Sequence, residues 1–199
     1  MTQTAVWLYW LGSYLLGGVP FGLLVSRAFG HDPRRHGSGN IGATNVNRVA
    51  GRLAGVLTLA LDVGKGALPV WLASRVLDEP LGPAGAALAA VAGHVFTPYL
   101  RFRGGKGVAT AAGAFAVLTP LPALIALGVF LLLTAGTRYV SLGSVGASVA
   151  LPALCLWLAP GSGQVAAAAG CGLLVIVRHL DNLKRLLSGE EDQIGDSRH

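Results

Sequence analysis

Charged residues are scarce in this 199-residue chain: they make up 12% of the sequence, while 53% of the residues are hydrophobic. An ordinary soluble domain carries about a quarter charged residues. The mean hydropathy of +0.61 is likewise too high for a domain that folds in water. The composition therefore excludes an ordinary soluble domain and predicts an integral membrane protein in a lipid bilayer.

Cysteine is also scarce, and Cys155 and Cys171 both lie in apolar runs. A disulfide framework or a metal cluster would need more cysteines, or histidines at ligand spacing, and the sequence has neither. We expect two buried thiols that act as small apolar side chains, and we predict neither a metal nor a cofactor.

Basic residues are missing from Met1–Gln3, and no small-residue cleavage pattern follows the first apolar run. We therefore expect no signal peptide, and the first run should remain as a transmembrane helix. Elsewhere the basic residues lie in short loops without interleaved aromatic residues, which disfavours nucleic acid as the partner for the net charge of +6. Membrane orientation and an anionic ligand explain this charge better.

Long apolar runs are abundant, and a helix that crosses the hydrocarbon needs about 20 such residues. The clear candidates are Ala5–Ser26, Leu53–Ser74, Pro83–Leu100, Ser141–Leu158 and Gln164–Val177. The run Val108–Thr137 is too long for one span and short for two, and Pro120 and Pro122 break it in the middle.

The distribution of Lys and Arg decides how this run is read, because cytoplasmic loops are enriched in both. If Val108–Thr119 and Leu121–Gly136 are two spans, thirteen basic residues share one face and only Arg75 lies on the other. The thirteen are Arg27, Arg34, Arg35, Arg48, Arg52, Arg101, Arg103, Lys106, Arg138, Arg178, Lys184, Arg185 and Arg198. We therefore predict an all-α polytopic bundle, one domain over residues 1–199, with seven spans, the N-terminus outside and the C-terminus in the cytoplasm.

The first loop, which we place between Arg27 and Arg52, contains GSGNIGATNVNR. A connection between helices usually needs about two to eight residues, so a loop this long is expected to be functional. Glycines and small donors favour an anion cradle over an ordinary polar turn. Its donors are Ser38, Asn40, Thr44, Asn45 and Arg48.

A Gly104-Gly105-Lys106-Gly107 turn opens the helix predicted from Val108. The first N–H groups of a helix are unpaired and carry partial positive charge, so this turn suits a phosphate group. The spacing of a nucleotide-binding P-loop is absent from the sequence.

The cytoplasmic tail carries polar residues at a spacing of three, which places them on one helical face. They are His179, Asn182 and Arg185. Leucines on the adjacent side suggest a helix along the membrane surface. The alternative is a basic tail that only helps to set the orientation of the protein in the membrane.

Asp62 and Lys65 lie three positions apart inside the second predicted span. A charge at the bilayer centre costs about 2.5–3.5 kcal/mol. We therefore expect the pair to face a polar cavity, either as structural support or in contact with a ligand.

Together these segments resemble the acyl-phosphate-dependent glycerol-3-phosphate acyltransferases, integral membrane enzymes of bacterial phospholipid synthesis. The matching strings are GSGNIGATNVNR, GHVFTPYLRFRGGKGVAT and HLDNLKRLLSGEE, together with the spaced Asp62-Val-Gly-Lys65-Gly66. The resemblance covers essentially the whole chain, although Asn47 and Leu180 depart from its pattern.

The resemblance implies transfer of an acyl group from acyl phosphate to the 1-hydroxyl of sn-glycerol 3-phosphate. The products would be lysophosphatidate (1-acyl-glycerol 3-phosphate) and phosphate, as in the first acylation step of phospholipid synthesis. It also implies a bacterial inner membrane protein with its site on the cytoplasmic side, and we expect a monomer. By position, the implied catalytic residues are Ser38, Arg48, Lys106, His179 and Asn182. The implied substrate ligands are Asn40, Thr44, Asn45, Gly104, Gly105, Gly107, Ser144, Arg185, Glu191 and Lys65.

No activated nucleophile is evident, since both cysteines are in apolar runs and no Gly-x-Ser-x-Gly elbow occurs. An acyl phosphate is already an activated anhydride, so positioning and charge stabilisation can supply the catalysis. We expect direct attack by the substrate hydroxyl while Lys106 and Arg48 neutralise phosphate charge. Either His179 or the acceptor's own phosphate would take the proton, and the resemblance favours the phosphate.

Two other classes fit the composition less well. A transporter of an organic phosphate anion usually shows an inverted repeat, and the sequence has no repeat. A membrane transferase that uses nucleotide-activated alcohols generally needs clustered aspartates for a divalent metal, whereas Asp62 stands alone in its span.

Overall fold

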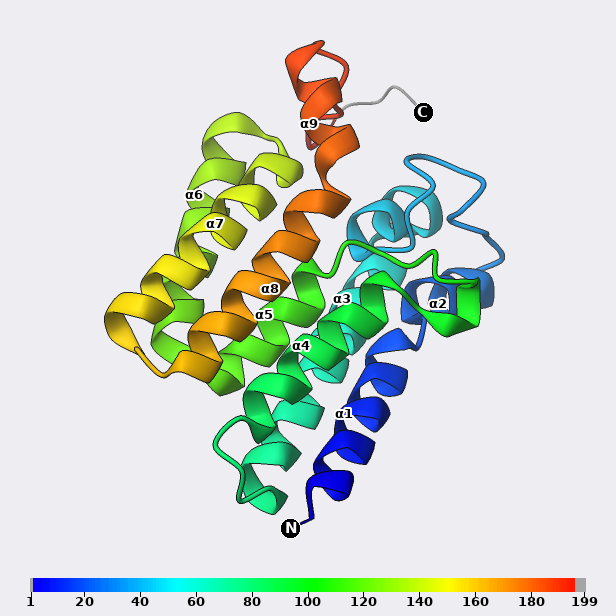
Figure 1. Cartoon of the computed structure of the whole chain (residues 1–199). Helices are drawn as coiled ribbons and strands as arrows, with labels where there is room; N and C mark the ends of the chain where they lie inside the picture. Colours follow the sequence, from blue (N-terminus) through cyan, green and yellow to red (C-terminus); the bar gives the residue numbers. More distant parts are fainter. Residues whose placement is uncertain (1, 196–199) are drawn as a thin grey trace.

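A computed structural model describes residues 2–195, and within that range the protein is helical, without strands (Figure 1). Arg198, one of the thirteen basic residues counted above, lies outside the described range. The helices are α1 (Gln3–Gly18), α2 (Phe21–Ala28), α3 (Ala43–Val76), α4 (Gly82–Val95), η1 (Pro98–Leu100), α5 (Val108–Leu118), α6 (Pro120–Thr137), α7 (Val140–Leu158), α8 (Ser162–Arg178) and α9 (Leu180–Leu187).

Each of the seven predicted spans corresponds to a helix or a helix pair, but their lengths differ. Among residues 2–195, four stretches are long and apolar enough to cross a membrane: Gln3–Ala28, Ala43–Val76, Pro120–Thr137 and Val140–Leu158. A fifth is added if α8 and α9, bent by 51°, count as one span. α5 is apolar but short, and α4 ends at Val95 rather than at Leu100 as predicted. The predicted break before Pro120 is present, because α5 ends at Leu118.

The first predicted span is interrupted, because Val19 and Pro20 separate α1 from α2. Proline lacks an N–H and disfavours helical backbone at the residue before it. The carbonyl of Val19 instead accepts a hydrogen bond from Lys65 Nζ at 2.8 Å. The charge of the second span therefore lies against the break in the first.

Glycines let the central helices approach each other closely, as the abundance of small residues predicts. A Cβ atom on Gly93 of α4 would lie 2.0 Å from the carbonyl oxygen of Tyr14 in α1. A Cβ on Gly113 of α5 would lie 2.0 Å from the carbonyl oxygen of Val63 in α3. Backbone-to-backbone contact thus fixes the α1–α4 and α3–α5 crossings.

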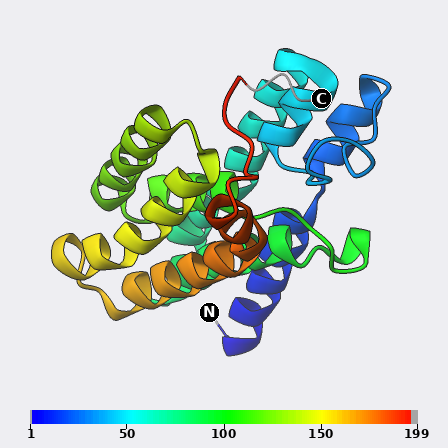
Figure 2. The ribbon, with the colours of Figure 1, turned by 90° about the horizontal axis from the view of Figure 1, so that it is seen from above.

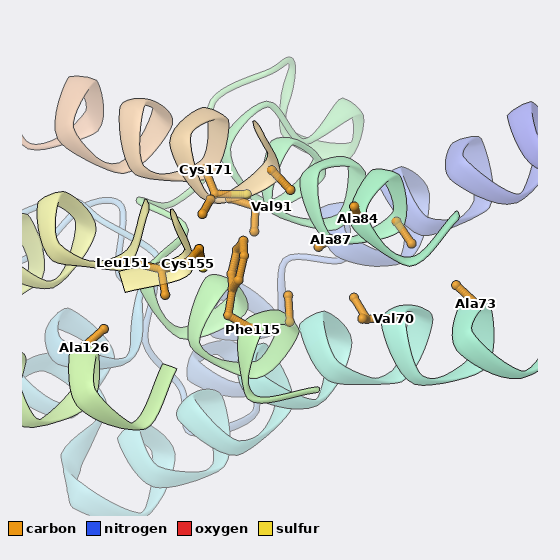
Figure 3. Close-up of a cluster of buried hydrophobic side chains, with 14 of the residues drawn as sticks. Val70, Ala73, Ala84, Ala87, Val91, Phe115, Ala126, Leu151, Cys155 and Cys171 are labelled. Carbon is orange, nitrogen blue, oxygen red and sulfur yellow. The ribbon is translucent and has the colours of Figure 1, made fainter. Parts of the chain in front are cut away.

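The buried apolar core lies where α3, α4, α5, α7 and α8 meet, with Phe115 between the two cysteines and the small residues of α4 (Figure 3). Cys155 and Cys171 are free and buried, as expected. Many large apolar side chains instead face outward; Leu132 is 77% exposed and Trp157 78% exposed. An apolar exterior around a core of small residues is the arrangement expected in lipid.

The polar segments gather at one end of the bundle, opposite the N-terminus (Figure 1). These are the first loop, the turn before α5, and α9 with the tail that follows it. Viewed onto this end, α9 and the tail lie over its centre, between α3 and the α6–α7 pair (Figure 2). The bundle thus brings together segments that are far apart in the sequence.

Candidate functional site

The first loop is built around Asn45, whose side chain is buried. Its Nδ2 donates to the carbonyls of Pro33 at 2.9 Å, His36 at 3.2 Å and Asn40 at 2.8 Å. Its Oδ1 accepts the backbone N–H of Ser38 at 3.0 Å. The loop uses both N–H groups of this amide and one acceptor site of its oxygen, so Asn45 shapes the loop, and its contact with a ligand stays a prediction.

The loop is shorter than predicted, because α3 begins at Ala43 and not near Leu53. Gly51 interrupts α3 with a φ of 87°, which is strained for any residue with a side chain, so residues 43–50 form a separate helical arm. Thr44 and Arg48 lie on this arm. The side chain of Asn40 accepts a hydrogen bond within the loop, from the N–H of Gly42 at 2.8 Å.

The glycine turn before α5 folds back onto the end of α4. The N–H of Gly104 donates to Val95 O at 3.0 Å, and the N–H of Gly105 donates to His94 O at 3.1 Å. Gly107 caps α5 in the left-handed conformation, with a φ of 87°. Gly104 and Gly105 therefore shape the turn, and their N–H groups are not available to an anion.

Arg178, at the end of α8, holds the same turn from the other side. Its Nη2 donates to Gly104 O at 3.0 Å, and its Nε donates to Gly105 O at 3.3 Å. The sequence places this arginine only on the basic face. No sequence spacing links it to the turn, so the contact could be found only in the fold.

Lys106 connects the turn to α9 and to the tail. Its Nζ donates to Asn182 Oδ1 at 2.5 Å, and Asn182 Nδ2 donates to Glu191 Oε1 at 2.6 Å. Arg185 Nε donates to Glu191 Oε2 at 2.9 Å. Four of the residues proposed from the sequence thus form one connected polar cluster.

The arm that begins α3 reaches this cluster through Arg48. Its Nη1 lies 2.9 Å from Asp192 Oδ2 in the tail. A cavity of about 280 Å³ lies between the first loop and the tail. Its lining residues are Gly37, Ser38, Arg185, Glu190 and Asp192. In the sequence, only the run of acidic residues after α9 indicates that carboxylates would line this cavity.

Burial, together with the nearby positive charges of Arg185, Arg178 and Arg48, lowers the pKa of Lys106 to about 8, against the opposing effect of Glu191. The ammonium therefore remains protonated at pH 7. The four cations Lys106, Arg48, Arg178 and Arg185 outnumber the three carboxylates Glu190, Glu191 and Asp192 by one, so the site keeps a small excess of positive charge that favours an anionic ligand.

Burial likewise lowers the pKa of His179 to about 4, and the charge of Lys106 contributes to this shift. Its imidazole is therefore neutral at pH 7. Nδ1 lies 2.8 Å from the carbonyl oxygen of Val175, so Nδ1 carries the proton and Nε2 can only accept. His179 can thus orient a hydroxyl group but is a weak base.

Two proposed ligands lie in internal contacts of the helices. Ser144, buried in α7, donates its hydroxyl to Val140 O at 2.8 Å. Lys65 Nζ lies 2.8 Å from Asp62 Oδ1, in addition to its bond to Val19. For Lys65 this arrangement favours structural support over ligand contact. Across the described range, no group of three or more His, Cys, Asp or Glu side chains is placed to hold a metal.

Residues 7–189 match the family described as Glycerol-3-phosphate acyltransferase. The glycerol-3-phosphate acyltransferase of Trichlorobacter lovleyi is 48% identical over 188 residues, covering 94% of this chain and 96% of the relative. The glycerol-3-phosphate acyltransferase of Syntrophotalea carbinolica is 48% identical over 193 residues, covering 96% of this chain and 98% of the relative.

Two solved structures share the fold over 96% of both chains. Both are of PlsY (YgiH), described as an integral membrane glycerol 3-phosphate acyltransferase. The glycerol 3-phosphate form has a TM-score of 0.92 at 36% identity, and the lysphosphatidic acid form has a TM-score of 0.90 at 35% identity.

Proposed function

The chain belongs to the glycerol-3-phosphate acyltransferase family, and we propose that its acyl donor is acyl phosphate and its acceptor the 1-hydroxyl of sn-glycerol 3-phosphate. The products are then lysophosphatidate and inorganic phosphate, the outcome of the first acylation step in phospholipid synthesis. The proposal rests above all on the polar cluster around Lys106. Cations from the α3 arm, the glycine turn and α9 meet there, which suits two phosphate-bearing substrates.

The proposed topology has seven spans, formed by α1 with α2, then by each helix from α3 to α8, within one domain over residues 1–199. The N-terminus is outside, and the site faces the cytoplasm from the bacterial inner membrane. The charge distribution supports this topology, because Arg75 ends α3 at the end opposite the polar segments. We expect a monomer, since one chain supplies every residue of the cluster.

In the proposed reaction, the 1-hydroxyl oxygen attacks the carbonyl carbon of the acyl phosphate. The new ester C–O bond forms, the bond between the carbonyl carbon and the phosphate oxygen breaks, and phosphate departs with the electron pair. Lys106 and Arg48 neutralise the charge of the phosphate group of glycerol 3-phosphate and of the departing phosphate, and Ser38, at the wall of the cavity, provides a hydroxyl for hydrogen bonding.

The hydroxyl proton goes to the phosphate of glycerol 3-phosphate. A phosphate monoester has a second pKa of about 6, whereas the pKa of His179 is about 4. The phosphate is therefore the stronger base of the two. His179 and Asn182 then orient the acceptor, and Asn45, Gly104 and Gly105 hold the loops that surround it.

The decisive experiment compares acyl donors. Purified protein in detergent or nanodiscs is given glycerol 3-phosphate with either acyl phosphate or acyl-CoA, and phosphate and lysophosphatidate are measured. We expect equimolar products with acyl phosphate only, at a rate that EDTA does not change. Product from acyl-CoA alone would refute the proposed donor. If neither donor gave product, transport of an organic phosphate would become the better reading.

A further inference from the structure

His94, in the last turn of α4, lies directly beneath the glycine turn. A Cβ atom added to Gly105 would lie 2.2 Å from His94 Nε2, 3.0 Å from Cε1 and 3.1 Å from Cδ2. The closest neighbours of Gly105 at this point are thus atoms of one imidazole. The imidazole is buried, so it has little room to move aside.

The opposite edge of the imidazole faces the ion pair of the second span. Asp62 Oδ1 lies 3.8 Å from His94 Nδ1 and 2.8 Å from Lys65 Nζ. All three side chains are buried. A buried ion pair is a poor source of stability because both charges lose their hydration, so a specific structural role is the better explanation of its presence.

The glycine turn is therefore held from two sides. His94 lies below Gly105 and also accepts its N–H through the backbone carbonyl, while Arg178 binds the carbonyls of Gly104 and Gly105. Lys106 is the next residue along the chain. Any movement of Gly105 toward or away from the imidazole moves the backbone that carries the Lys106 ammonium.

We infer that His94 is a positioning residue: its imidazole, backed by Asp62 and Lys65, sets the height of Gly105 and so the reach of Lys106 toward the phosphate group of the substrate. The inference rests on the proposed function, because it assigns Lys106 to that phosphate. A misplacement of about 1 Å can cost about 100-fold in rate. A small change at the His94 side chain should therefore change the reaction rate measurably.

The contact between Gly105 and His94 is tested by adding a methyl group at the first residue and removing the imidazole at the second, singly and together. Gly105→Ala should lower kcat/KM for glycerol 3-phosphate about 100-fold, because its Cβ overlaps the imidazole. His94→Ala should lower it about tenfold, because the turn loses its floor. Combined with His94→Ala, the Gly105→Ala change should recover at least tenfold relative to Gly105→Ala alone. A double variant as poor as the product of both single effects would overturn the inference.

Gly104→Ala is the matched control. Its Cβ would lie 2.0 Å from the backbone oxygen of His94 and 2.7 Å from that of Val95, and neither atom is removed by His94→Ala. The same second substitution should therefore give no recovery in this background. Equal recovery at both glycines would show general loosening and would also overturn the inference.

A second pair of variants covers the case in which the alanine variants do not fold. Asp62→Asn should raise the KM for glycerol 3-phosphate about tenfold, and Asp62→Glu should restore part of it. Val70→Ala, a cavity in the same helix, should lower the Tm without raising this KM. If Asp62→Asn lowered only the Tm, as Val70→Ala does, the positioning role would be rejected.

Lys106→Ala separates this inference from the proposed function. It should lower kcat/KM about 100-fold or more. If it does so while the His94 and Asp62 variants show none of the expected effects, only the positioning role fails. If Lys106→Ala leaves kcat/KM unchanged, the assignment of Lys106 to the substrate phosphate fails, and the positioning role fails with it.

Discussion

Asp192 in the C-terminal tail pairs with Arg48 at the start of α3, with Oδ2 and Nη1 2.9 Å apart. The pair joins two segments that are separated by most of the chain. It also places a carboxylate on a cation that we assign to substrate phosphate, so the carboxylate and the substrate compete for the same guanidinium.

Removing this competitor should tighten substrate binding. Asp192→Asn keeps the shape of the side chain and removes its charge, so the KM for glycerol 3-phosphate should fall about fivefold, which corresponds to about 1 kcal/mol for a partly exposed pair. Asp181→Asn is the control, because its carboxylate pairs with Lys184 on the exposed side of α9. A rise in KM for Asp192→Asn would instead mean that the carboxylate orients Arg48 for the substrate.

The activity should fall at alkaline pH because of Lys106. Burial lowers the pKa of its ammonium to about 8, so the group is charged below pH 8 and loses its charge as the pH rises further. A plot of kcat/KM against pH, which reports the free enzyme, should therefore decline above about pH 8. Arginine stays charged at every accessible pH. Lys106→Arg should remove this decline even if the rate is lower, and a decline that stays in place would exclude Lys106 as its source.

His179 should be dispensable as a base. Since its pKa is about 4, we expect His179→Gln to keep kcat within about threefold and to raise the KM for glycerol 3-phosphate five- to tenfold, the loss of about one hydrogen bond. The acid limb near pH 6, which we assign to the substrate phosphate, should remain in the variant. Loss of this limb together with a large fall in kcat would identify His179 as the base.

The glycine contacts between helices should be sensitive to a single methyl group. Gly93→Ala would place its Cβ 2.0 Å from Tyr14 O, so it should destabilise the bundle by about 1–3 kcal/mol. Gly128→Ala in α6 is the matched control, because no atom lies within 4 Å of its added Cβ. The control should be neutral or stabilise α6 by up to about 1 kcal/mol. Thermal unfolding in detergent compares the two, and equal melting temperatures would contradict close packing at Gly93.

Much of the fold follows from the sequence, because apolar runs and prolines act locally. Pro120 ends one helix and begins another, as its missing N–H requires. The break at Pro20 escaped prediction, since the apolar run continues across it. The carbonyl of Val19 is satisfied there by the N–H of Phe21 and by Lys65, and only the fold shows the second partner. The start of α3 at Ala43 was not predicted for the opposite reason: its first turns are polar, and a polar segment between apolar runs indicates a loop.

The candidate site was predictable only as a set of polar segments at one end. Lys106, Asn182 and Glu191 do lie together there. Whether a polar side chain faces a ligand or its own backbone depends on partners that spacing does not reveal. Asn45 is a residue type that often binds ligands, yet its side-chain amide makes its hydrogen bonds within the loop. His94 received no role from the sequence, because its contact with Gly105 exists only after α4 and the turn have packed.

The bond between Lys65 and the carbonyl of Val19 also constrains how the protein is made. Each group has one partner within its own segment, since the N–H of Phe21 donates to Val19 O at 3.0 Å and Asp62 Oδ1 lies 2.8 Å from Lys65 Nζ. If each segment entered the hydrocarbon alone, the bond between them would be missing, and the Asp62–Lys65 pair would face lipid, where charged side chains are costly. The first two long segments should therefore leave the insertion machinery as a pair, and a Lys65→Leu protein should be released one helix at a time.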